Sequence, residues 1–186
     1  MKKTIIAATI AASAVFGTQA FAAGNSAYLT ILGNVTETGE SCNVTPGLAI
    51  QGGVLKLSDV KASALEALAV NTPHMALAGD IEYKIEDCQK GATDYSGNLN
   101  IAVTGDYISG MDDVLTNTAA GGAKNASVAV IKTDGSRISL TGATPDVVPF
   151  VAGKASTVFY KAAYVKTANG VTQGPVKGVA TFTISY

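Results

Sequence analysis

Side chains able to act as nucleophiles, bases or metal ligands are few in this chain of 186 residues. No serine or cysteine nucleophile motif surrounds its single histidine, His74. A surface loop position therefore explains this residue better than a role as base or ligand. The carboxylates of Asp80, Glu82 and Glu86 could suggest the paired acids of a glycosidase. They alternate with apolar residues, however, which favours the solvated face of a strand.

Metal and cofactor chemistry is equally poorly supported. The pair Asp112-Asp113 could help to hold calcium, but a turn is the better interpretation. One histidine and two cysteines do not make a structural zinc site. The sequence therefore predicts a protein that is not an enzyme and that has no cofactor and no metal site.

The overall composition indicates one folded domain without affinity for nucleic acid. The chain has 13 lysines and arginines against 14 aspartates and glutamates, a net charge of −1. No basic field exists to hold a phosphate backbone. With 47% hydrophobic and only 15% charged residues, the chain is also too apolar to be disordered.

The first 22 residues have the pattern of a secretion signal. Lys2 and Lys3 precede a run of 12 apolar or small residues, and Ala20-Phe21-Ala22 offers a cleavage site. The run is too short for a membrane anchor, which needs about 20 apolar residues. No later segment is long enough either, so the sequence predicts an exported mature chain without a membrane span.

Export determines how the two cysteines are interpreted. Cys42 and Cys88 are the only pair, and an exported chain meets an oxidising environment, which predicts a disulfide between them. The alternative is two free thiols or a redox pair, but no CxxC spacing supports it.

Alternation of apolar and polar residues dominates the rest of the sequence. One short helix is expected within residues 58–70, where Ser58 could cap it. Asp134-Gly135 is typical of a tight hairpin. Many short strands in one disulfide-linked domain predict a β-sandwich. The expected strands cover residues 28–35, 54–57, 80–86, 99–103, 128–132, 138–140, 158–165 and 180–186.

Both ends of the mature chain are strand-like and apolar on one face. The last expected strand runs to Tyr186, where the sequence stops, and the first follows closely on the signal peptide. If the sandwich is one strand short, the final strand forms an open edge that another polypeptide must cover. Alternatively, the two ends pair with each other inside one closed domain. The pattern alone leaves both possibilities open.

Four segments together resemble the subunits of chaperone–usher fimbriae, specifically the major, type 1-like pilins. They are the alternating segment 29–35 ahead of Cys42, the strand end 85–88 that carries the second cysteine, the segment 126–131 with its following hairpin, and the ending 180–186. The resemblance spans nearly the whole mature sequence.

The resemblance implies an all-β fold, an incomplete immunoglobulin-like sandwich completed by a donor strand from another subunit. It implies a signal peptide at 1–22, an N-terminal donor extension at 23–33 and a pilin domain at 34–186. The donor residues would be Ala27, Leu29, Ile31 and Gly33. The acceptor strand, which also contacts chaperone and subunit, would present Ala180, Phe182, Ile184 and Tyr186.

The implied function is that of a structural subunit of a surface fimbria, polymerising by donor-strand exchange and supporting cell adhesion. Its implied partners are identical or related pilins, a periplasmic chaperone and an outer-membrane usher, and its implied route leads through the periplasm to the cell surface. One alternative is a secreted lectin-like sandwich; the chain has no tryptophan, but tyrosines such as Tyr107 could stack on sugars. Another is a minor fimbrial adaptor.

Overall fold

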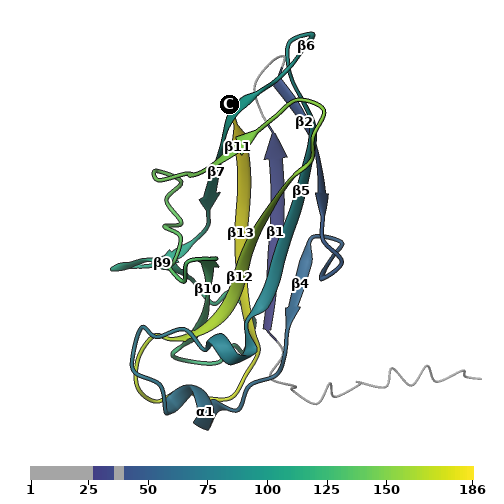
Figure 1. Ribbon diagram of the computed structural model, residues 1–186. Coiled ribbons are helices and arrows are strands. Elements are labelled where there is room, and N and C mark those ends of the chain that lie inside the picture. Colours follow the sequence, from purple (N-terminus) through teal and green to yellow (C-terminus); the bar gives the residue numbers. More distant parts are fainter. Residues whose placement is uncertain (1–26, 36–39) are drawn as a thin grey trace, which may run out of the picture.

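The computed structural model describes residues 27–35 and 40–186, without the side chains of residues 28, 31–35 and 40. The predicted signal peptide and residues 23–26 of the predicted extension lie outside this description. The body is an elongated sandwich, with a short helix at one end and the carboxyl terminus at the other (Figure 1).

Two sheets of long strands form the sandwich, which confirms the predicted all-β class. The first sheet runs in the order β11 (Asp146–Phe150), β7 (Gly97–Thr104), β13 (Val176–Ser185), β1 (Ala27–Val35), β4 (Val54–Leu57) and β3 (Ile50–Gln51). The second runs in the order β10 (Ala126–Lys132), β12 (Ser156–Lys166), β5 (Gly79–Lys90) and β2 (Glu40–Pro46), with β6 (Thr93–Asp94) paired to β5. A small hairpin joins β8 (Tyr107–Ile108) to β9 (Met111–Leu115).

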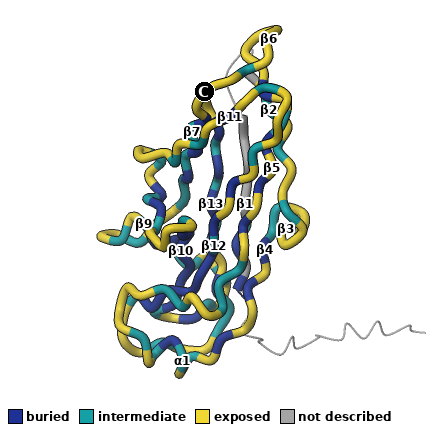
Figure 2. Tube along the Cα trace, in the orientation of Figure 1, coloured by how far each residue is buried: buried dark blue, intermediate teal, exposed yellow. Residues whose placement is uncertain are grey.

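Strand β5 shows why the sequence folds into a two-layered body. Ile81, Tyr83 and Ile85 are buried, and they alternate with exposed Asp80 and Glu82. One face of the strand therefore enters the core and the other faces water. The predicted solvated face is confirmed for Asp80 and Glu82. Buried residues follow the inside of both sheets along the whole body (Figure 2).

The short helix expected within residues 58–70 is confirmed, and one further short helical element is present. Within residues 58–70 only α1 (Ala62–Glu66) is helical, and a second short element, η1 (Met75–Leu77), was not predicted. Ser58 does not cap α1, because the residue before the helix is Lys61. The Ser58 carbonyl instead accepts a hydrogen bond from the hydroxyl of Tyr164 at 3.0 Å. None of the helices in the described residues is long and apolar enough to cross a membrane.

The turn predicted at Asp112-Asp113 was wrong, because both residues belong to β9. Nη2 of Arg137 lies 2.9 Å from Oδ2 of Asp113, while Nη1 donates to Oδ1 of Asn71 at 2.7 Å. Asp112 accepts a hydrogen bond from Ser139. Both carboxylates thus serve to hold the hairpin on the sandwich, and the described residues contain no cluster of three or more potential metal ligands.

His74 lies in the connection between α1 and β5, immediately before η1. The predicted loop position is confirmed, although the residue is half-buried rather than at the surface. Its backbone N–H donates to the Tyr164 carbonyl at 2.7 Å. This contact gives His74 a structural role in holding the connection against β12.

Candidate functional site

The first strand of the chain, β1, fills the place beside the last strand. It runs parallel to β13, with Ala27 opposite Val176 and Val35 opposite Ile184, and antiparallel to β4 on its other side. The two ends of the chain therefore pair with each other in the single subunit, the second of the two arrangements that the sequence left open. We call the space between β13 and β4 the acceptor groove.

The floor of the acceptor groove is apolar and partly aromatic. Ala180, Phe182 and Ile184 on β13, three of the residues named above for an acceptor strand, are buried. The Phe182 ring lies 5.4 Å from that of Tyr83 and 5.5 Å from that of Tyr160, both on the opposite sheet. These tilted ring pairs stabilise the floor beyond simple burial.

Large and small residues alternate between β1 and β13. Leu29 is opposite Gly178, Ile31 is opposite Ala180, and Gly33 is opposite Phe182. A side chain at Gly178 would force Leu115 to move, because its Cβ would lie 2.7 Å from Cδ1 and 3.2 Å from Cβ of Leu115. A shift of two residues along the groove would bring two large residues or two small ones together. Volume therefore helps to fix the register of the inserted strand.

The four predicted donor residues lie on the strand that fills the groove. Ala27 and Leu29 are fully buried there. Ile31 and Gly33 are placed by their backbones only, and the side chain of Ile31 lies outside the described part. Sequence analysis missed the other wall of the groove, formed by Leu55 and Leu57 of β4, which pair with Leu29 and Ala27. Strand β4 itself was expected, but its pairing partner is decided by tertiary structure.

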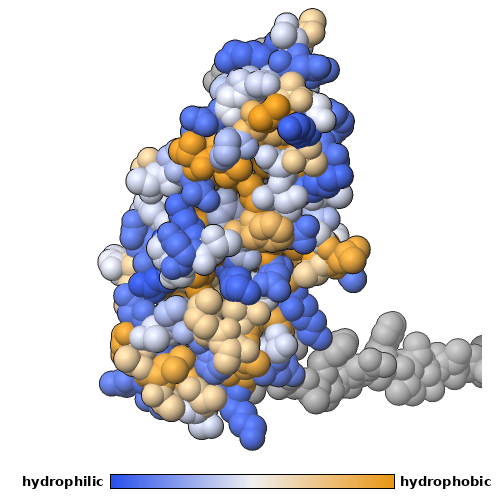
Figure 3. Space-filling model, viewed as in Figure 1, coloured by the Kyte–Doolittle hydropathy of each residue, from blue (hydrophilic) through white to orange (hydrophobic). Residues whose placement is uncertain are grey.

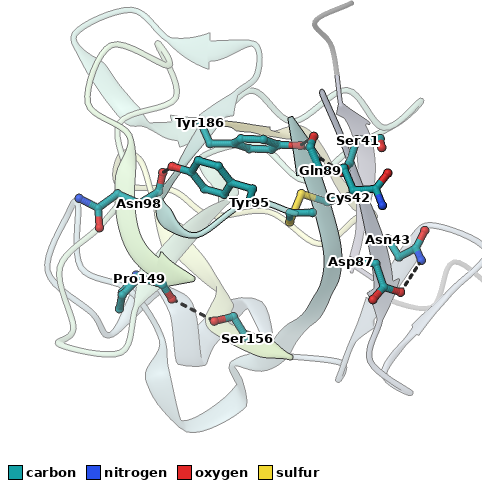
Figure 4. The surroundings of a disulfide bond; sticks show 11 residues. Ser41, Cys42, Asn43, Asp87, Gln89, Tyr95, Asn98, Pro149, Ser156 and Tyr186 are labelled. Atoms are coloured by element: carbon teal, nitrogen blue, oxygen red, sulfur yellow. Dashed lines mark hydrogen bonds between the residues drawn. A yellow bond between two sulfur atoms is a disulfide. The ribbon is translucent and has the colours of Figure 1, made fainter. Parts of the chain in front are cut away.

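Tyr186 follows β13 and closes the end of the sandwich (Figure 4). Its hydroxyl contacts two carbonyl oxygens, of Ser41 at 3.1 Å and of Gln89 at 2.6 Å. Its ring lies 4.3 Å from the ring of Tyr95. Nζ of Lys90 donates to the Tyr186 backbone oxygen at 3.4 Å. Through these contacts Tyr186 joins the end of β13 to the second sheet, and we call this arrangement the Tyr186 clasp. Nothing in the sequence pattern indicated Tyr95 as its partner.

The predicted disulfide is confirmed. Cys42 on β2 and Cys88 on β5 are joined with an S–S distance of 2.08 Å. Their chain neighbours Ser41 and Gln89 supply the two carbonyls that Tyr186 contacts. The disulfide thus lies next to the clasp at the end of the last strand (Figure 4).

Three buried tyrosines predict that the fold weakens at high pH. Burial raises the pKa of Tyr83 and of Tyr160 above the usual value of 10.0, and raises that of Tyr164 to about 12. At a pH between the unfolded and the folded pKa values, these tyrosines are deprotonated in the unfolded chain but still protonated in the folded chain. The free energy of unfolding therefore falls as pH rises above 10. We expect urea unfolding to show a loss of about 1.4 kcal/mol per pH unit for each tyrosine.

The Tyr160→Phe variant is the control for this prediction. It lacks one titrating group, so its stability should fall less steeply above pH 10 than that of the parent. Equal slopes for both proteins would show that Tyr160 does not contribute to the alkaline loss.

Comparison with known proteins identifies the family. The sequence profile described as "Fimbrial protein" matches residues 29–186. The crystal structure of PapA, the rod subunit of the P pilus, is similar with a TM-score of 0.58 and 23% identity, covering 78% of this chain and 98% of that one. A subunit from a chaperone–usher pilus structure on rod uncoiling has a TM-score of 0.57 and 22% identity, covering 78% and 86%.

A type I fimbria protein of Burkholderia pseudomallei is a third similar structure, with a TM-score of 0.52 and 17% identity over 79% of this chain and 99% of that one. A comparison with curated protein sequences found no significant match. The solved structures share the immunoglobulin-like pilin fold, and the family profile covers most of the chain. The chain therefore belongs to the fimbrial protein family and is a structural subunit of a pilus.

Proposed function

We propose that these subunits polymerise by exchanging the first strand, so that β1 of one subunit lies in the acceptor groove of the next. The observation that carries this proposal is that β1 completes the first sheet between β13 and β4 while lying at the N-terminal end of the described chain. Because β1 is the first element of the described chain and continues into β2 through residues 36–39, it can leave the groove without removing another described strand.

The short connection favours a different orientation for an exchanged strand. Val35 lies opposite Ile184, at the disulfide end where β2 begins. Reversing β1 in its own groove would take Val35 to the Val176 end, about 26 Å away at 3.3 Å per residue. Four connecting residues span at most about 18 Å. A subunit's own β1 can therefore enter the groove only parallel to β13. A strand from another subunit is free to enter antiparallel.

Antiparallel insertion provides a reason for exchange to be favoured. Antiparallel pairs are slightly more stable per residue than parallel ones. The apolar contacts in the groove remain available to either orientation, since Leu29 and its neighbours on the same face stay two residues apart. Each buried aliphatic side chain contributes roughly 1.5–3 kcal/mol. The exchanged joint would hence be at least as stable as the closed subunit.

The proposal requires assembly partners that act on the acceptor groove. Before exchange the groove has to be kept from closing on the subunit's own strand. A periplasmic chaperone that lends a strand to β13 would do this, and an outer-membrane usher would bring the next subunit to the groove. Strand addition of this kind is the general mode of chaperone–pilin complexes. It is consistent with the predicted export signal and with a cell-surface fimbria.

Deletion of residues 23–33 tests the proposal. The mature chain should elute as multimers in size-exclusion chromatography, and the shortened chain should form none. The shortened chain should instead bind an added peptide of residues 23–35 in a one-to-one complex. Multimers that are unaffected by the deletion would contradict strand exchange. A monomer that is indifferent to both the deletion and the peptide would support the secreted binding module instead.

A further inference from the structure

A hollow of about 510 Å³ lies on the outer face of the first sheet, beside the β8–β9 hairpin. This face is opposite to the acceptor groove, because Val179 and Thr181 alternate along β13 with the inward-facing Ala180 and Phe182. Figure 1 shows β9 standing out from the body next to β7 and β10. The hollow is lined by Thr104, Gly105, Asp106, Tyr107, Leu140, Thr141, Val179 and Thr181.

The polar groups of the hollow are available to a ligand. Within the described residues, the side chains of Asp106 and Tyr107 make no hydrogen bond or ion pair, and the same is true of the hydroxyls of Thr104 and Thr181. The Tyr107 residue is 44% exposed. Leu140, at 1% exposure, supplies an apolar floor. An unpaired carboxylate, free hydroxyls and an exposed ring thus meet on one small surface.

The backbone around these groups is fixed by close packing. A Cβ at Gly105 would lie 2.6 Å from both Cδ2 of Leu115 and the Val179 carbonyl oxygen, so the chain passes β13 at a distance that only glycine permits. Gly105 N–H donates to the Leu140 carbonyl at 3.1 Å, and the Asp106 carbonyl accepts from Thr116 N–H at 2.7 Å. Asp106 and Tyr107 are therefore presented by a constrained segment, which lowers the entropy cost of binding.

We propose that this hollow binds a neutral saccharide. A carboxylate can accept hydrogen bonds from sugar hydroxyls, and such charge-assisted bonds are stronger than neutral ones. The apolar C–H face of a sugar ring can pack on the tyrosine ring, since aromatic side chains combine a large apolar face with a polar edge. Among the described residues that line the hollow there is no lysine, arginine or histidine. Sialic acid, phosphate and sulfate would meet the negative charge of Asp106 without a compensating cation.

Because the hollow is open, we expect one subunit to bind with a dissociation constant in the millimolar range. This corresponds to a binding free energy of about −4 kcal/mol. Repetition of the site along a fibre would raise the apparent affinity by about 10²–10⁴ through multivalency. The proposal does not depend on strand exchange, because the closed subunit already contains every lining residue.

Nuclear magnetic resonance titration of the ¹⁵N-labelled closed monomer, separated from multimers by size-exclusion chromatography, tests the proposal. The probes are methyl β-D-galactoside, methyl α-D-mannoside, methyl N-acetyl-β-D-glucosaminide and, as the anionic comparison, N-acetylneuraminic acid. At least one neutral sugar should shift the amides of residues 104–107 and 179–181 in a saturable manner. Shifts confined to other residues, stronger shifts with N-acetylneuraminic acid, or none with all four probes would overturn it.

Two variants and one control identify the groups that bind. Tyr107→Ala and Asp106→Asn should each weaken binding of the responding sugar by about tenfold or more, the loss expected for one hydrogen bond to a charged group or one stacked ring. Phe159→Ala removes an aromatic side chain of similar exposure, 52%, on the other sheet, and should leave the affinity unchanged. An unchanged affinity in both hollow variants, with both folded as judged by their spectra, would overturn the assignment.

Discussion

A subunit carrying Leu29→Asp is expected to accept a neighbour's strand but to donate none of its own. Leu29 is fully buried on β1, between Gly178 of β13 and Leu55 of β4. An aspartate there would bring an unpaired charge into the apolar groove, at a cost on the order of 5 kcal/mol. The acceptor groove itself is unchanged, because its remaining walls belong to other strands.

The matched control is Thr30→Asp, which places the same charge one residue further along the same strand. Thr30 is only half-buried and lies on the opposite face from Leu29. Electron microscopy should show fibres with Thr30→Asp and none with Leu29→Asp. Normal fibres from the Leu29 variant would contradict the donor assignment.

Mixing the Leu29→Asp subunit with the parent subunit separates loss of donation from loss of folding. The variant should be incorporated once and then stop growth, so fibres should shorten in proportion to the fraction of variant added. A variant that has simply failed to fold would leave the length of the parent fibres unchanged. Binding of a peptide of residues 23–35 to the variant provides a second, independent check that its groove is intact.

Replacement of both cysteines by alanine is expected to lower the free energy of unfolding by about 4 kcal/mol. The disulfide joins residues 46 positions apart, and closing a loop of that length removes this much entropy from the unfolded chain. Urea unfolding of the closed mature subunit measures the change. A loss below 1 kcal/mol would contradict the expectation.

The disulfide should also be coupled to the Tyr186 clasp. Tyr186→Phe removes the hydroxyl that contacts the Ser41 and Gln89 carbonyls but keeps the ring beside Tyr95. Since these carbonyls flank the two cysteines, Tyr186→Phe should cost less stability in the cysteine-free protein than in the parent. Equal costs in both backgrounds would show that the two features act independently.

The sequence alone was sufficient for the class of fold and for the disulfide. Local alternation of apolar and polar residues identified β5 and β13 and predicted which of their residues are buried, because side-chain direction in a strand has a period of two. Export predicted the disulfide, because only two cysteines were present. Strand β2 and the β9 hairpin were not predicted from the sequence, because polar residues such as Asp112 and Asp113 interrupt the alternation that indicates a strand.

Which strand fills the groove beside β13 was decided only by tertiary structure. The alternation in residues 29–35 shows that this strand has a face to bury, but periodicity contains no information about which partner it buries that face against. The opposition of Leu29 to Gly178 and the clasp at Tyr186 join residues distant in sequence, and the four-residue connection to β2 becomes a limit only against the length of the folded groove. Their effects depend on volume, reach and hydrogen-bond geometry in three dimensions, which a one-dimensional pattern does not specify.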